Sequence, residues 1–345
     1  MNRNISARAV VFCSALLFCS AAAAKSRYDG PVIDMHLHAY EEEMPASLCI
    51  PWITQFPAWD TREAWNDIWI KAMVEPPCND PIPPVSPADD ALMKATIAAM
   101  EERHVIGVLS GAPDETRRWR DAAPERFLPS LEFRIGRDDQ TPDDIRALLE
   151  TGDFIALGEI SNQYGGVAPD DERMAPFWAL AEELDIPVAI HMGDGTVGTA
   201  YLAFPGAADY RAKLSNPYLL EEVLIRHPRL RVSVMHYGAP LVDEMIAMLA
   251  SHPQVYIDIG GMQWYYPRAF FYEHLRKFVD AGFGKRIMFG SDQGEWPGVI
   301  GPAIDIIDEA PFLTKEQKAD IFYNNAARFL RLSEEEIEAH HEMAE

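Results

Sequence analysis

Short apolar runs alternate with amphipathic segments along most of the chain. The runs are rich in β-branched residues and continuously apolar, which is typical of parallel strands buried on both faces. We expect eight strands, at residues 32–38, 105–110, 127–133, 155–159, 187–191, 231–236, 255–258 and 286–290. A segment with helical spacing follows each run, so the pattern predicts an α/β fold, a (β/α)8 TIM barrel. A doubly wound open sheet is the alternative, but no glycine-rich nucleotide-binding motif supports it.

The helical segments carry recognisable start signals. At Ser86 and at Thr141, a capping residue is followed by proline and by an acid three residues on. Helices are expected at 86–103, 114–123, 141–152, 172–184, 217–226, 241–251, 268–279 and 298–332. The acidic tail at 333–345 is expected to fray or to add a last helical turn.

Residues 40–86 interrupt the alternation directly after the first strand. This segment is rich in proline, includes a short helical stretch at 60–74, and contains Trp52, Trp59, Trp65 and Trp69. Insertions of this length more often form a lid or a binding loop than a passive linker. The alternative is an ornament packed on the outside of the barrel.

The N-terminus has the pattern of a signal peptide at residues 1–24. Arg3 and Arg8 precede an apolar stretch at 9–19, and four alanines follow at 21–24. The apolar stretch is too short for a membrane span of about 20 residues. We therefore expect an exported, periplasmic protein without membrane attachment after cleavage, with the barrel within residues 25–332.

Export changes the expected state of the cysteines. Cys13 and Cys19 would leave with the signal peptide, so the mature chain keeps Cys49 and Cys78. An even pair in an oxidising compartment favours a disulfide, which would stabilise the fold by roughly 3–4 kcal/mol on the chain-entropy model. Two free thiols are the alternative.

The charge of the chain limits its partners. With 54 acidic and 30 basic residues, the formal net charge is −24. Nucleic-acid binding needs clustered lysine and arginine, so the balance argues against such a partner. A small-molecule substrate is expected, and assembly into a homo-oligomer stays open.

Polar side chains able to bind metal stand where the predicted strands end. His36 and His38 point to the same face because side chains on a strand alternate with period 2. Other strand ends contribute Glu159, His191, His236 and Asp292. The carboxyl ends of barrel strands converge on one mouth, so these residues predict a site for one or two divalent metals, with zinc preferred. Six further histidines are assigned to structure: His104, His227, His252, His274, His340 and His341.

The ordered set of these six residues resembles that of the amidohydrolase superfamily. The similarity is greatest to the amidohydrolase-related branch that includes aminocarboxymuconate-semialdehyde decarboxylase, and it extends from residue 33 to 330. By this resemblance, His36, His38 and Asp292 would bind one metal. Glu159 would bridge it to a second metal. Many relatives carry a carboxylated lysine at that bridging position, whereas the similar TatD-type nucleases carry glutamate.

The resemblance also implies the chemistry. His191 and His236 would complete the second metal site, and Asp292 would shuttle a proton for a metal-activated water in an ester, lactone or amide hydrolase. In mononuclear relatives His236 acts on the substrate as general base or electrophile, and Glu159 is then structural. A non-oxidative decarboxylase of an aromatic or unsaturated acid is one alternative function, and a non-catalytic ligand- or metal-binding barrel is another.

Candidate substrate contacts come from rings and one cation near the strand ends. Tyr164 follows Glu159, Tyr237 follows His236, and Trp264 and Arg268 follow the seventh strand. Loops at this face line the pocket of a barrel, so an apolar or aromatic substrate is expected. Packing of these rings under a lid, and a surface position for Arg268, are the alternatives.

Overall fold

The structure is a computed structural model that describes residues 27–40, 46–85, 90–135 and 138–344. The predicted signal peptide and the predicted helix start at Ser86 lie outside the described residues. None of the helices formed by the described residues has the length and apolar character needed to cross a membrane.

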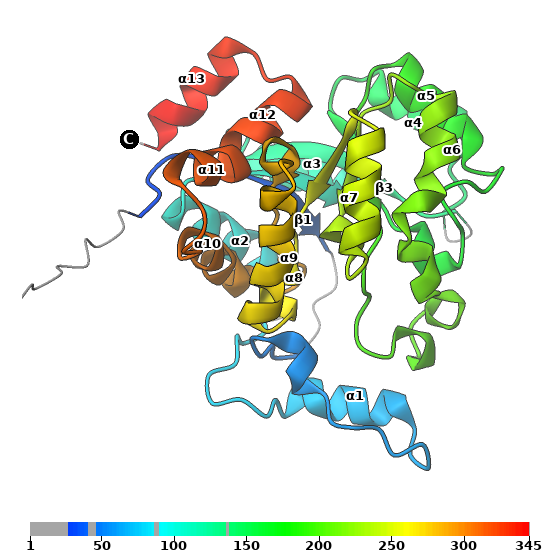
Figure 1. The fold of residues 1–345 in the computed structure, drawn as a ribbon, viewed down its shortest axis with the longest axis vertical. Helices are drawn as coiled ribbons and strands as arrows, with labels where there is room; N and C mark the ends of the chain where they lie inside the picture. Colours follow the sequence, from blue (N-terminus) through cyan, green and yellow to red (C-terminus); the bar gives the residue numbers. More distant parts are fainter. Residues whose placement is uncertain (1–26, 41–45, 86–89, 136–137, 345) are drawn as a thin grey trace, which may run out of the picture.

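Eight parallel strands follow one another around a barrel in the order β1 to β8 (Figure 1). The edge strands meet where the backbone N–H of Met35 donates to the carbonyl of Phe289 at 2.9 Å. This sequential order confirms the predicted TIM barrel, because a doubly wound sheet reverses its strand order. The strands are β1 (Val32–Ala39), β2 (Val105–Gly111), β3 (Phe127–Phe133), β4 (Ala156–Ile160), β5 (Val188–His191), β6 (Val232–Met235), β7 (Val255–Asp258) and β8 (Ile287–Met288).

The helices surround this barrel close to their expected positions. The capping box predicted at Thr141 is present, with the backbone N–H of Asp144 donating to the threonine hydroxyl. The α-helices are α1 (Trp65–Val74), α2 (Ala91–Glu102), α3 (Pro113–Ala122), α4 (Pro142–Leu149), α5 (Ala175–Glu183), α6 (Glu221–Arg226), α7 (Val242–Ser251), α8 (Met262–Tyr265), α9 (Arg268–Asp280), α10 (Ile300–Asp308), α11 (Lys315–Ala319), α12 (Asn325–Leu330) and α13 (Glu334–Met343).

The C-terminal region contains several helices, as expected for 298–332, and Thr314 caps the start of α11. Its tail differs from the prediction. The tail forms the ten-residue helix α13 rather than a frayed end or a single turn. Ser333 caps this helix in a capping box with Glu336, and the ring of His340 bonds the hydroxyl of Tyr323 at 3.0 Å. Capping and this buried contact stabilise a segment whose composition suggests only a solvated tail.

The insertion after β1 forms a compact unit. The predicted disulfide between Cys49 and Cys78 is present. Residues 48 and 82 pair in an antiparallel bridge. The buried amide of Gln55 donates to the carbonyls of Ser47 and Ala72 and accepts from the backbone N–H of Cys49. These contacts tie the two ends of the insertion together.

The insertion also bonds the loop that follows β5. The indole N–H of Trp65 donates to the carbonyl of Val197, and that of Trp69 donates to the hydroxyl of Thr196, both at 3.0 Å. In Figure 1, α1 lies at the end of the barrel opposite α13. The insertion therefore lies beside the carboxyl end of β5, on the face where the predicted metal ligands gather.

Candidate metal centre

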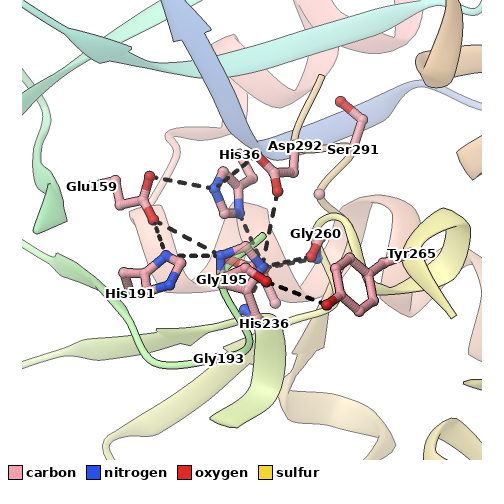
Figure 2. Close-up of polar contacts among 12 residues, drawn as sticks. His36, Glu159, His191, Gly193, Gly195, His236, Gly260, Tyr265, Ser291 and Asp292 are labelled. Carbon is pink, nitrogen blue, oxygen red and sulfur yellow. Dashed lines mark hydrogen bonds and ion pairs between the residues drawn. The ribbon is translucent and has the colours of Figure 1, made fainter. Parts of the chain in front are cut away.

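The six predicted ligands converge at the carboxyl ends of the strands. Figure 2 shows His36, Glu159, His191, His236 and Asp292 pointing toward one another. Three overlapping groups each keep their ligand atoms within 4.8 Å of one another. The groups are His36, His38 and Glu159; His36, His236 and Asp292; and Glu159, His191 and His236.

Glu159 lies between two pairs of imidazoles. Its Oε1 is 2.5 Å from Nδ1 of His191 and 3.8 Å from Nε2 of His236. Its Oε2 is 3.4 Å from Nε2 of His38 and 3.7 Å from Nε2 of His36. Each carboxylate oxygen thus faces a different histidine pair, an arrangement in which one carboxylate can contact two cations.

Asp292 lies on the opposite side of the His36 and His38 pair. Its Oδ1 is 3.2 Å from Nε2 of His38 and 3.5 Å from Nε2 of His36. Its Oδ2 is 4.0 Å from Nδ1 of His236. The backbone of Asp292 is left-handed, with φ of 53°, and its N–H donates to the carbonyl of His36 at 2.9 Å. This turn after β8 directs the carboxylate into the site.

Asp258, the last residue of β7, is a supporting carboxylate that the sequence analysis missed. Its Oδ1 lies 3.4 Å from Nδ1 of His36 and accepts from the backbone N–H groups of His236 and Gly260. A carboxylate that binds one ring nitrogen leaves the other nitrogen free to bind a metal. The sequence could have revealed Asp258 in the same way as the candidate ligands, because it is an acid at the end of a predicted strand.

The backbone after β7 packs directly against the cluster. A Cβ atom at Gly260 would lie 2.4 Å from Nδ1 of His36. Gly261 has φ of +75°, and a Cβ atom there would lie 2.6 Å from Oδ2 of Asp292. Both positions therefore require glycine, which fixes the space available to the ligands.

Burial and charge together set the ionisation of the ligands. Burial alone would lower the pKa of His36, but the charges of Asp292 and Asp258 outweigh it and raise this pKa well above its usual value. Burial alone would raise the pKa of Glu159, but its bond to His191, the charge of that ring and further bonds to His236 and His36 together outweigh burial and hold this pKa well below its usual value. Burial and the charge of His236 lower the pKa of His191. The acids are thus ionised, as metal ligation requires.

A buried nitrogen in the cluster supports cation binding. Within the described part of the chain, Nε2 of His36 has no hydrogen-bond partner, although the side chain is completely buried. This atom faces the oxygens of Glu159 and Asp292. Unpartnered buried polar atoms are rare in proteins, and imidazole with carboxylate is a donor set that divalent zinc accepts. The residues therefore fit a divalent metal.

A cavity of about 890 Å³ opens onto this cluster. Of the four predicted substrate contacts, Tyr164 and Trp264 line it. The ring of Tyr164 lies 4.8 Å from that of His191, and the indole N–H of Trp264 donates to the carbonyl of Ser291. The full aromatic lining, apart from the histidines, is Tyr40, Trp52, Trp69, Tyr164, Phe204, Trp264, Tyr265 and Trp296.

The other two predicted substrate contacts lie elsewhere. Tyr237 is 1% exposed, and its hydroxyl is bonded to Nδ1 of His274 in α9. The chain turns through left-handed backbone at His236 and Tyr237, which directs the tyrosine ring into the core instead of the cavity. Arg268 begins α9 on the surface and pairs with Glu309. The structure thus corrects both expectations.

Several charged residues in the cavity wall were not anticipated. Glu132 and Arg134 line the cavity where β3 ends, and Asp194 lines it in the loop after β5. Burial raises the pKa of Asp194 to about 6. The sequence signal for them was a charged residue near the end of β3 or β5, but these residues do not fit the pattern of metal ligands.

Several remaining histidines have partners that match their assignment to structure. His227 lies 3.0 Å from Glu182, and His252 lies 3.6 Å from Glu221. His274 and His340 each bond a tyrosine hydroxyl. None of these four rings belongs to the metal-ligand groups found among the described residues.

Three solved structures share the fold over nearly their whole length. The 5-carboxyvanillate decarboxylase of Sphingomonas paucimobilis has 17% identity and a TM-score of 0.55, covering 88% of this chain and 99% of that one. A 2,6-dihydroxybenzoate decarboxylase has 16% identity and a TM-score of 0.56, covering 88% of this chain and 100% of that one. A probable 2-pyrone-4,6-dicarboxylic acid hydrolase of Acinetobacter baumannii has 16% identity and a TM-score of 0.55, covering 87% of this chain and 99% of that one.

The sequence comparisons identify the family. No curated protein matches the chain. The family model described as amidohydrolase matches residues 33–332, which include all six candidate ligands. Amidohydrolases are metal-dependent, in agreement with the donor set at the barrel mouth. The chain therefore belongs to the amidohydrolase family, as its sequence motifs indicate.

Proposed function

We propose that this protein hydrolyses an ester, lactone or amide bond in a small organic substrate, using two divalent cations bridged by Glu159. The observation that carries the proposal is the position of this carboxylate. One of its oxygens faces His191 and His236, and the other faces His36 and His38. Zinc is the cation that this nitrogen and oxygen donor set favours.

Cations held by these residues would supply Lewis acidity and make water a stronger acid. Asp292 is suited to accept the proton of the attacking water and to return it to the leaving group, because it is less enclosed than the other candidate ligands. Its side chain keeps 23% of its surface exposed, against none for His36. Burial alone would raise the pKa of Asp292, but the charges of His36 and His236 outweigh it and lower this pKa, which keeps the carboxylate ionised.

The orientation of His236 leaves one ring nitrogen for the chemistry of the site. Its Nδ1 lies 2.8 Å from the carbonyl of Gly260 and donates a proton to it. Nε2 of the ring then points toward His191 and Glu159. This orientation suits a ligand in the binuclear arrangement and equally a general base in the mononuclear one.

A non-oxidative decarboxylase is the second candidate function. Arg134 lines the cavity and could pair with a substrate carboxylate. Two of the solved structures with the same fold are named as decarboxylases of aromatic acids. In this reaction the carboxylate leaves as CO₂ and a proton replaces it on the same carbon, so no water is consumed.

One screen separates these functions. Metal-loaded and chelated protein would be supplied with lactones, esters, amides and aromatic acids, while acid production and CO₂ release are followed. We expect acid production that chelation and Asp292→Asn both abolish. CO₂ release from an acid would establish the decarboxylase instead. Tight ligand binding without turnover, unchanged in Asp292→Asn, would indicate the non-catalytic barrel.

We further propose that the protein is exported. The N-terminal sequence pattern and the Cys49–Cys78 disulfide support this proposal. N-terminal sequencing of protein isolated from its native cells should begin at Lys25. A start at Met1 would contradict export with cleavage.

A further inference from the structure

Apart from the candidate metal ligands, the cavity wall has more acidic than basic side chains. Acidic residues line the cavity near β3, after β5 and after β8, whereas Arg134 is the one basic residue among the described lining residues. The backbone N–H of Arg134 donates to the carboxylate of Asp138 at 2.7 Å. The acidic lining residues outside the ligand set are Glu132, Asp138, Asp194 and Glu295.

Asp194 is the most firmly positioned of these acids. The hydroxyl of Tyr266 donates to its Oδ2. The hydroxyl of Tyr265 donates to the carbonyl of the next residue, Gly195, at 3.2 Å (Figure 2). A third tyrosine, Tyr210, donates from its hydroxyl to the carbonyl of Gly193 at 3.1 Å. Three tyrosines thus hold the loop that carries the Asp194 carboxylate against the cavity.

The aromatic lining adds a second, independent preference. Rings such as Trp264 and Tyr265 come from the chain after β7, and Trp52 and Trp69 come from the insertion. The negative face of an aromatic ring attracts cations, most strongly where water is excluded. Rings beside an ionised carboxylate are a combination that suits an ammonium group.

We infer that Asp194 determines specificity by binding a positively charged ammonium group of the substrate while the scissile carbonyl lies at the metal ligands. This inference rests on the proposed hydrolase function. This preference would distinguish the pocket from those of the solved structures described above, whose names refer to carboxylic acids. An anionic group at the same place would face the carboxylates of Asp194 and its neighbours and would be repelled.

The test uses three methyl phenylacetates that differ only at the para position. One carries a trimethylammoniomethyl group, one its neutral isostere neopentyl, and one a carboxymethyl group. With the metal-loaded full chain, kcat/KM should be at least tenfold higher for the ammonium ester than for the neutral ester, and lowest for the anionic ester. Equal values, or the highest value for the anionic ester, would overturn the inference.

Variants assign the preference to this residue. Asp194→Asn should reduce the ratio between ammonium and neutral esters to nearly one. Asp243→Asn is the matched control, because this acid is exposed on α7 and pairs with Lys277. It should keep the full ratio. If Asp194→Asn does not fold, Tyr266→Phe should lower the ratio severalfold by releasing the carboxylate. A ratio that survives in every soluble variant would refute the role of Asp194.

Binding distinguishes failure of this inference from failure of the proposed function. The free acids of the three esters would be titrated into metal-loaded protein by calorimetry, which needs no turnover. If no ester is hydrolysed but the ammonium acid binds at least tenfold more tightly than the neutral acid, and Asp194→Asn removes this difference, the inference stands and the hydrolase proposal fails. Hydrolysis of the three esters at equal rates would support the hydrolase proposal and overturn the inference about Asp194.

Discussion

The barrel mouth and the insertion at residues 46–85 form two sides of one cavity but are held in place differently. The ligands stand on strands whose side chains are buried, and β1 is buried along its whole length. The insertion exposes apolar side chains such as Ile70 and Val74, and is held by a few buried side chains such as Trp52, by one disulfide and by hydrogen bonds to the loop after β5. Strand ends can therefore hold reacting groups in fixed positions, whereas the insertion shapes access to them.

Removing ligands from the barrel mouth should have the largest effect. The double variant His36→Ala with His38→Ala should lose bound metal and at least about 10³-fold in kcat/KM, because a catalytic cation is worth several kcal/mol in the transition state. Metal analysis and kinetics on the purified variant would measure this.

The matched control is His227→Ala, which removes a histidine paired with Glu182 outside the site. It should keep both metal and activity. Comparable losses in the control, or an active double variant, would contradict the assignment of chemistry to the strand ends.

Removing the disulfide tests the role of the insertion. The double variant Cys49→Ser with Cys78→Ser should lower the free energy of unfolding by roughly 3–4 kcal/mol, because the unfolded chain gains the freedom of an unlinked loop. Denaturant titration would measure this. KM should rise while metal content is unchanged. Loss of metal in this variant would show that the insertion, and not only the barrel, builds the metal centre.

The supporting carboxylate Asp258 should have a smaller effect than the ligands. Asp258→Asn removes the charge beside Nδ1 of His36 but keeps the shape of the side chain. Metal affinity should fall about 10–100-fold, as for other residues that orient a metal-binding histidine. Competition with a chelator would measure it. An unchanged affinity would mean that the backbone alone orients His36.

The smallest effect is expected from a single bond between the insertion and the barrel. Trp69→Phe keeps a ring but loses the N–H that donates to Thr196. One such bond is worth about 1 kcal/mol, so KM should rise roughly two- to tenfold with kcat unchanged. Trp59→Phe is the control, because its N–H bonds Glu63 inside the insertion. Equal KM values for the two variants would show that the bond between Trp69 and Thr196 does not hold the insertion in the position that substrate binding needs.

The same comparison explains what could be predicted from the sequence. The gathering of the six candidate ligands was predictable because buried strands give clear apolar runs, and each candidate stands near the end of one. Asp258 has the same signal and could have been found. Tyr237 was misplaced because two consecutive left-handed residues redirect its ring into the core, and no sequence rule indicated them. The packing of Trp52 and Trp69 around the cavity depends on long-range contacts of an irregular segment, which periodicity does not encode.

Metal content tests the central claim most directly. Protein purified with zinc and freed of loosely bound ions should contain two ions per chain, and Glu159→Ala should lower this number to one or none. One ion per chain in the parent protein, unchanged in Glu159→Ala, would contradict a bridged pair of cations at the barrel mouth.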